Sequence, residues 1–520
     1  MSAALVFTII SVIIAIILAY YNHVRNYWKR KGVPGPPGEL FFGNLKELDN
    51  REVLNVFKKQ EWTKKYGKVY GIMEGSRQLL ITSDLDLLQE LFVKKFEYFH
   101  GRRLHPLIGN VDDHKNKIVN LFNSRGSRWK RLRNVSNSSF NVVNLKLIHP
   151  TVQDSINELL VHLEKAVGKE IDAYPYFQEL TMDIISRIAL GQEESKLFNN
   201  QFLENVKGVF ETRVVSYPEY IAFMFPFVVQ PLRALVFFLK VTAAGYIQKV
   251  RANLRKVVDA RKTQRNQNSK DIQFNDGEKK KVDYIDLFLD LESEPFTDDG
   301  STLLDKHHLK VDKKLTTDEV VSMCQVFLLA GYDTTATSIA YVIHNLATYP
   351  EVQKKLQTEI DEYGVSEEPS YDEIQKLKYL DAVVKESLRL HPLAARASAR
   401  ECMESTTLGD INVDKGVQVV ADVFSIHYSK EIWGPDAHVF NPDRWLTEEK
   451  RHPMAWIPFG AGPRTCVGMR LAYLEEKNFL ISCLKKFNIF KTKNTPEKLK
   501  LCGALVIAPE NIKVRFELRE

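Results

Sequence analysis

The pattern of apolar and polar residues divides the chain into a short apolar start and a long mixed body. Residues 3–21 form an almost unbroken apolar run, long enough to cross a bilayer of roughly 30 Å as a helix. No lysine or arginine precedes this run, whereas Arg25, Lys29, Arg30 and Lys31 follow it. This bias predicts a retained anchor with the following chain in the cytosol. A cleaved leader is the alternative, but the run lacks both a basic start and a small-residue cleavage site.

A proline-rich stretch, Val33–Gly38, follows the basic residues. Proline fixes φ and removes a backbone donor, so this stretch predicts a stiff, extended hinge. Such a hinge would hold a globular body at a set angle to the membrane. We therefore divide the chain into a transmembrane signal anchor (1–22), a basic and proline-rich hinge (23–38) and a body (39–520).

The longest helical pattern lies in the second half of the chain. Thr316 and Glu319 have capping-box spacing, and the apolar pattern that follows continues to Ala347, before Pro350. At 1.5 Å per residue this predicts a helix on the order of 45 Å long. Residues 320–330 are apolar nearly all round, as in a buried core helix. A second membrane span is the alternative, made costly by Gln325, Asp333 and His344.

Shorter patterns predict the smaller elements. These are a strand at Leu79–Ile81, helices at Asp84–Lys94, Gly126–Asn134 and Gly468–Phe479, and paired strands within Leu408–Val420 around the turn Asp414–Gly416. The stretch Arg261–Lys281 is polar and lacks apolar periodicity, so we expect an exposed, mobile loop there.

The segment Tyr217–Phe238 is unusual for a soluble surface, because seven aromatic residues lie among three prolines. The prolines break it into pieces too short to span a bilayer. Aromatic-rich short segments favour a membrane interface or the roof of a substrate pocket. We hypothesise that this segment dips into the membrane that holds the anchor and admits lipophilic substrates; core packing is the alternative.

Composition narrows the classes of protein further. With 520 residues and 44% apolar content, the chain can bury a large core. Its net charge of +6 is too small for a dedicated nucleic-acid binder, and basic–aromatic alternation is absent. Its five cysteines are odd in number and scattered, so we expect a reducing, cytosol-facing compartment rather than a disulfide framework.

The candidate chemistry centres on the loop Phe459–Gly468, which contains Cys466. Glycines let backbone N–H groups approach a sulfur that side chains would otherwise crowd. Cys466 has neither a CxxC nor a CxxH partner, so a zinc site is a poor fit. A single thiolate is sufficient as the axial ligand of a haem iron, and it leaves the opposite face of the iron open. A buried cysteine in a turn is the alternative for any single cysteine.

The pattern F-x-x-G-x-R-x-C-x-G resembles the haem-ligand loop of the cytochrome P450 family, the haem-thiolate monooxygenases. The resemblance makes Cys466 the axial ligand and puts Arg464 at a haem propionate. It also implies that Phe459 shields the sulfur, that Gly462 and Gly468 shape the loop, and that the helix after Gly468 favours the thiolate through its N-terminal dipole.

Other segments extend the resemblance to the haem propionates. Trp129 and Arg133 lie four apart, on one face of the predicted helix, and can present two donors to one anion. A surface-packed tryptophan is the alternative for this pair alone. Beside the cysteine loop the pair resembles the family's propionate-binding pair, and the same resemblance adds Arg396 and Arg102.

The centre of the long helix reads Ala330-Gly331-Tyr332-Asp333-Thr334. Small residues let a flat ligand approach, and a mid-helix threonine can bond back to the carbonyl four residues earlier and open a notch. The segment is similar to the family's A-G-x-D/E-T motif, in which an acid and an alcohol relay protons to iron-bound dioxygen. On that resemblance Asp333 is the acid and Thr334 the alcohol; solvated side chains are the alternative.

The spacing E-x-x-R puts Glu386 and Arg389 on one helix face, which alone says little. The resemblance joins them to Arg444 in a buried structural triad behind the haem loop. The family more often has Glu at Asp443, Phe is common at Trp445, and neither departure affects the arginine.

The resemblance implies one mostly α (α+β) haem domain over 39–520, with a long central helix and small sheets. It implies haem b, dioxygen, lipophilic substrates, and electrons from an NADPH–cytochrome reductase, with cytochrome b5 as a further partner, at the endoplasmic reticulum membrane.

Within the family, the sequence as a whole most resembles the microsomal enzymes that oxidise drugs and steroids, and we expect an invertebrate member. Lys130 and Arg131 are candidate reductase contacts; plain solvation is the alternative for any single lysine. The alternatives are a haem isomerase or dehydratase, and a non-catalytic haem sensor or lipid-binding protein.

Overall fold

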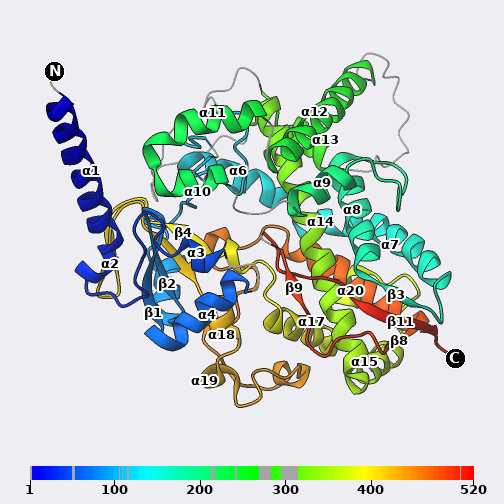
Figure 1. The fold of residues 1–520 in the computed structure, drawn as a ribbon. Coiled ribbons are helices and arrows are strands. Elements are labelled where there is room, and N and C mark those ends of the chain that lie inside the picture. The colour runs from blue at the N-terminus through cyan, green and yellow to red at the C-terminus, as the bar shows by residue number, and fades with distance from the viewer. Residues whose placement is uncertain are drawn as a thin grey trace.

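The computed structural model describes residues 3–49, 53–104, 106–107, 109–113, 116–211, 217–239, 243–268, 283–293, 314–503 and 505–520. In Figure 1 most helices gather on one side of the molecule and the main sheet lies on the other, with the N-terminal helix projecting from the sheet side. The α-helices are α1 (Ala3–Arg25), α2 (Tyr27–Arg30), α3 (Leu45–Leu48), α4 (Asn55–Tyr66), α5 (Leu85–Gln89), α6 (Gly126–Ser139), α7 (Val142–Glu164), α8 (Tyr174–Leu190), α9 (Leu203–Glu211), α10 (Tyr217–Met224), α11 (Val229–Leu239), α12 (Ala243–Asn268), α13 (Tyr284–Leu289), α14 (Thr317–Thr348), α15 (Pro350–Glu362), α16 (Tyr371–Ile374), α17 (Lys378–Leu390), α18 (Val423–His427), α19 (Lys430–Trp433) and α20 (Met469–Lys486).

Small sheets complete the α+β architecture. The main sheet has the order β1-β2-β7-β4, with β2 and β7 parallel and the other pairs antiparallel. Its strands are β1 (Val69–Glu74), β2 (Arg77–Thr82), β4 (Ala399–Glu401) and β7 (Gln418–Ala421). The other sheets pair β3 (Glu170–Asp172) and β8 (Phe487–Lys491) with β11 (Lys513–Leu518), β5 (Thr406–Leu408) with β6 (Ile411–Val413), and β9 (Leu501–Cys502) with β10 (Ala508–Pro509).

The predicted central helix is confirmed as α14. Thr316 caps it with a complete capping box: its hydroxyl accepts from the Glu319 N–H, and the Glu319 carboxylate accepts from the Thr316 N–H. Most of its apolar stretch is buried among other helices, which identifies α14 as a core helix rather than a membrane span. Pro350 begins α15 directly after it.

Several boundaries differ from the sequence prediction. The stretch after Asp84 begins as a helix with Asp84 as N-cap, but continues over Glu90–Lys94 as a π-helix. The expected hairpin turn at Asp414–Gly416 is wrong: β5 and β6 form the hairpin, around Gly409 at φ +55°. Strand β7 instead lies between β2 and β4, which accounts for its nearly continuous apolar run.

The prediction of a loop at Arg261–Lys281 is also wrong for its first part, because α12 continues to Asn268. Arg261 donates to the carboxylates of Asp283 (2.6 Å) and Asp286 (2.9 Å), and Arg265 pairs with Asp290. This side of the helix is therefore held by charge pairs, which apolar periodicity does not detect. Residues 269–281 lie outside the described residues.

The segment after the apolar start is docked onto the main sheet. The indole of Trp28 donates to the Ile72 carbonyl (3.0 Å), and the Gly71 N–H donates to the Pro34 carbonyl (2.8 Å). Helix α1 is long and apolar enough to cross a membrane, and its apolar window is not buried in the protein. Near its C-terminal end the helix is tied to the body, where the Tyr21 hydroxyl donates to the Met224 carbonyl (2.9 Å).

Candidate active site

A cavity lies between the middle of α14 and the loop that contains Cys466. Ala330, Gly331 and Thr334 line the side formed by α14, and Phe459, Cys466 and Gly468 line the side formed by the loop. Trp129 and four arginines also line it: Arg102, Arg133, Arg400 and Arg464. The structure therefore brings most of the predicted site residues, from separate parts of the chain, around one space.

The loop conformation presents the sulfur of Cys466 to this cavity. The Cys466 N–H donates to the Phe459 carbonyl (3.0 Å), which folds the loop back on itself. Gly462 adopts φ +69°, and a Cβ there would lie 1.9 Å from the Phe92 carbonyl oxygen, so only glycine fits. Gly462 therefore shapes the loop without lining the cavity. Gly468 lines the cavity and is the N-cap residue of α20.

Different groups around the sulfur raise and lower the pKa of the Cys466 thiol. Burial raises the pKa of the Cys466 thiol, because the deep site disfavours an isolated charge. The N–H groups of Gly468 and Met469 at the start of α20, together with Arg133 and Arg102, lower this pKa. The N–H contribution agrees with the expected effect of the α20 terminus.

The arginines around the cavity form a cluster of cations without counter-ions. No carboxylate of a described residue pairs with Arg102, Arg133, Arg400 or Arg464. Burial and then mutual repulsion lower the pKa of Arg464 well below its usual value, and burial lowers that of Arg102 to about 10. The Nε atoms of Arg102, Arg400 and Arg464 are buried without a hydrogen-bond partner. These groups fit a dianionic ligand such as the two propionates of a haem.

One predicted member of this cluster lies elsewhere. Arg396 does not line the cavity; its guanidinium donates to the Asn55 side chain (3.2 Å). Arg400, four residues later, lines the cavity instead and stacks over the Phe92 ring, 4.7 Å from its centroid. Arg400 lies within β4 and is buried, and no signal in the sequence separates these two arginines.

Helix α14 turns its acid and its alcohol in different directions. The Thr334 hydroxyl lines the cavity and donates to the Ala330 carbonyl (2.5 Å), the back-bond expected for the notch. Asp333 is buried but does not line the cavity. Its carboxylate accepts hydrogen bonds from Tyr174 (2.7 Å) and Gln178 (3.0 Å) of α8.

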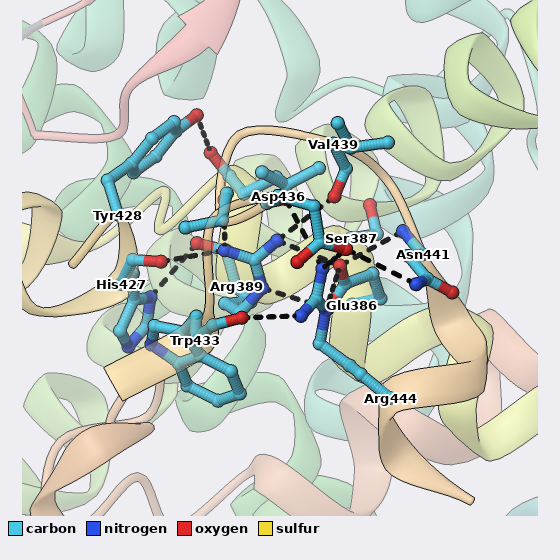
Figure 2. Close-up of polar contacts among 12 residues, drawn as sticks. Glu386, Ser387, Arg389, His427, Tyr428, Trp433, Asp436, Val439, Asn441 and Arg444 are labelled. Atoms are coloured by element: carbon cyan, nitrogen blue, oxygen red, sulfur yellow. Dashed lines mark hydrogen bonds and ion pairs between the residues drawn. The ribbon is translucent and has the colours of Figure 1, made fainter. Parts of the chain in front are cut away.

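The structure brings Glu386, Arg389 and Arg444 together in the protein interior (Figure 2). Glu386 accepts two bonds from Arg389 (2.8 and 2.9 Å) and one from Arg444 (2.9 Å). Trp445, at a position where Phe is common in the family, adds a further donor to Glu386 through its indole N–H (2.9 Å). The departure therefore strengthens the cluster rather than weakening it.

Arg389 also connects this triad to the cysteine loop. Its guanidinium donates to the carbonyls of His427 (2.7 Å), Ala437 (2.6 Å) and Val439 (3.2 Å), which fixes the irregular chain ahead of the loop (Figure 2). The His427 ring accepts from the Ile457 N–H (3.1 Å), two residues before Phe459. Burial lowers the pKa of His427 to about 3, so its ring stays neutral and keeps an acceptor nitrogen. Sequence reasoning did not identify His427.

Arg131 has a structural role rather than the expected exposed one. It is buried and forms an ion pair with Glu319 (2.8 Å), alongside Arg128 (3.0 Å). It therefore fastens α6 to the start of α14. Lys130 is half-exposed on the same helix.

A sulfur open to a deep cavity, an alcohol on the facing helix and a cluster of unpaired arginines together define a haem-thiolate protein. Comparison with known proteins agrees. A family model described as cytochrome P450 matches residues 33–516. Two Caenorhabditis elegans proteins with cytochrome P450 names are similar along nearly their whole length: cyp-13B1, 42% identical with 98% of this chain and 99% of the relative covered, and CYP13A4, 41% identical with 96% of each covered.

The chain belongs to the cytochrome P450 family. It is a P450 monooxygenase that uses haem with an axial cysteine thiolate, dioxygen, and electrons supplied by a partner protein. The nematode relatives confirm the expected invertebrate placement.

Proposed function

We propose that this chain is a membrane-anchored monooxygenase that inserts one atom of dioxygen into lipophilic substrates, such as xenobiotics, steroids or fatty-acid-like compounds. Its electrons come from an NADPH–cytochrome reductase, with cytochrome b5 as a further donor. One observation carries the proposal: Cys466 and Thr334 line opposite sides of the same buried cavity. Such a site could hold a haem through the sulfur of Cys466 and still leave room for substrate on the side of α14.

Several residues would hold the cofactor. Cys466 supplies the thiolate, and Trp129, Arg102, Arg133, Arg400 and Arg464 bind the propionates. When bound, the haem supplies dioxygen activation, and the thiolate favours O–O cleavage. Phe459 packs edge-on against Tyr473 (5.3 Å between centroids) and limits the access of water to the sulfur.

Other residues serve the open side of the site. Apolar side chains, including Val326, Phe327 and Leu393, line the cavity, where they orient a lipophilic substrate and exclude water. The Thr334 hydroxyl passes protons into the cavity and Asp333 supplies them from the side of α8. The half-exposed Lys130 is a candidate contact for an acidic reductase.

The apolar surfaces support anchoring at the endoplasmic reticulum, with α1 as a single span and the haem domain in the cytosol. Proline breaks the expected segment into α10, a 3-10 turn at Pro226–Val228, and α11. Phe227 and Phe238 are 76% and 82% exposed, whereas Phe223 is buried and Phe225 packs on Tyr21. Phe225 also packs against Phe227, so Phe227 lies near the body end of the anchor helix.

Phe227→Ser together with Phe238→Ser should release a chain that begins at residue 23 from phospholipid vesicles. At about 2 kcal/mol for each exposed aromatic side chain withdrawn from the membrane, binding should fall on the order of 1,000-fold. Vesicle co-sedimentation measures this loss. Phe223→Ser is the matched control: it should lower stability and leave vesicle binding of the folded protein unchanged. Equal binding by the double variant would refute the membrane contact.

The reaction is tested by NADPH consumption. Purified full-length protein is screened with lipophilic compounds for a shift in haem spin state, and the compound with the largest shift is incubated with reductase and NADPH. We expect NADPH consumption, dioxygen consumption and a product heavier by one oxygen atom. Rearrangement of a peroxide without NADPH would instead indicate an isomerase or dehydratase, and absence of both reactions a sensor or lipid-binding protein.

A further inference from the structure

Helix α8 makes a buried polar contact with the acid of α14. The carboxylate of Asp333 accepts from the Tyr174 hydroxyl at 2.7 Å and from the Gln178 amide at 3.0 Å. Tyr174 also lies 2.9 Å from the hydroxyl of Thr337, one turn further along α14. None of these four residues lines the cavity, although Thr334, adjacent to Asp333, does.

The direction of these hydrogen bonds follows from the protons available. A phenol carries one proton, and Tyr174 donates it to the carboxyl oxygen of Asp333. The Thr337 hydroxyl must then donate to the Tyr174 oxygen. Tyr174 and Asp333 are both buried, and burial followed by the charge of Asp333 raises the pKa of Tyr174, so the phenol keeps its proton.

The backbones around this contact are closely packed. The Thr181 hydroxyl of α8 donates to the Tyr332 carbonyl (2.7 Å). A Cβ added at Gly331 would lie 2.9 Å from the side chain of Ile185, so the two helices meet at a glycine. A change in the direction of the acid therefore requires rotation of the Asp333 side chain rather than separation of the helices.

We propose that Tyr174 and Gln178 are positioning residues that hold the carboxylate of Asp333 away from the cavity, so that the acid must give up their hydrogen bonds before it can turn toward the side where Thr334 lies. The proposal rests on the proposed roles of Asp333 and Thr334. A hydrogen bond to a charged acceptor is sufficient to shift a rotamer equilibrium on the order of 10- to 100-fold. Loss of the Tyr174 hydroxyl should therefore populate the inward direction of Asp333.

The test is the infrared stretch of carbon monoxide bound to the reduced full-length protein, because this frequency responds to polar groups that enter the cavity. We expect Tyr174→Phe to shift the band or add a second one. The change should disappear in the double variant Tyr174→Phe, Asp333→Ala, because alanine has no polar group to bring into the cavity. Tyr176→Phe, on the same helix but packed against Phe198, is the matched control and should leave the band unchanged.

Gln178→Leu is a second test variant, for which we expect a smaller change of the carbon monoxide band in the same direction. It can be measured if the Tyr174→Phe protein does not bind haem. An unchanged stretch in Gln178→Leu and in any haem-loaded Tyr174→Phe protein overturns the proposal, as does a change that persists in the Asp333→Ala background. Failure of the proposed haem-thiolate site is separate, since the wild-type absorption spectrum would then lack a thiolate-type carbon monoxide band.

Discussion

Arg389→Ala should yield no haem-loaded protein. The substitution leaves the Glu386 carboxylate in a fully buried position with only part of its donor set, and it releases three carbonyls of the chain that leads to the cysteine loop. Breaking a buried ion pair in this way costs about 3–5 kcal/mol, which is a large part of the roughly 5–15 kcal/mol that stabilises a typical domain. Haem content per polypeptide after purification measures the effect.

The matched control is Arg515→Ala. Arg515 pairs with Glu517 at 2.8 Å, but both side chains are 42% exposed, so this substitution should cost no more than about 1 kcal/mol and leave haem content normal. If Arg389→Ala protein instead retains the haem content of the control, the buried triad does not support the cysteine loop in the way we describe.

Cys466→Ser should abolish NADPH-dependent turnover. Serine preserves the size and shape of the side chain but removes the thiolate, so the loop can fold while the iron loses its proposed ligand. Turnover is measured with reductase and the compound that gives the largest spin-state shift in the wild type; we expect it to fall below detection. Cys502→Ser, at an exposed cysteine on β9, is the control and should retain wild-type turnover. Turnover by Cys466→Ser protein would contradict the assignment.

Local signals in the sequence were sufficient for the elements with strong patterns. The capping box at Thr316 and the apolar run that follows predicted α14 to within a residue at each end. Proline correctly predicted the break between α10 and α11. Helix α12 was missed at Arg261 because its stabilising partners, Asp283 and Asp286, lie on another helix. Contacts of this kind depend on tertiary structure, which a local pattern does not contain.

The candidate site was predictable to the extent that its residues lie in regular motifs. Trp129 and Arg133 follow helical geometry and line the cavity together. Arg396 and Arg400 flank the junction of a 3-10 turn and β4, where spacing does not determine side-chain direction. Asp333 and Thr334 point in different directions because successive residues of a helix lie about 100° apart around its axis. The partners of Asp333 on α8 could be identified only from the structure.

The central claim is that the sulfur of Cys466 binds the haem iron, and the absorption spectrum of the reduced protein with carbon monoxide tests it most directly. A thiolate ligand produces a distinctive band at longer wavelength than that of histidine-ligated haem proteins. We predict that the purified full-length chain shows this band and that Cys466→Ser lacks it. A histidine-type band, or a colourless protein after haem is supplied, would contradict the account.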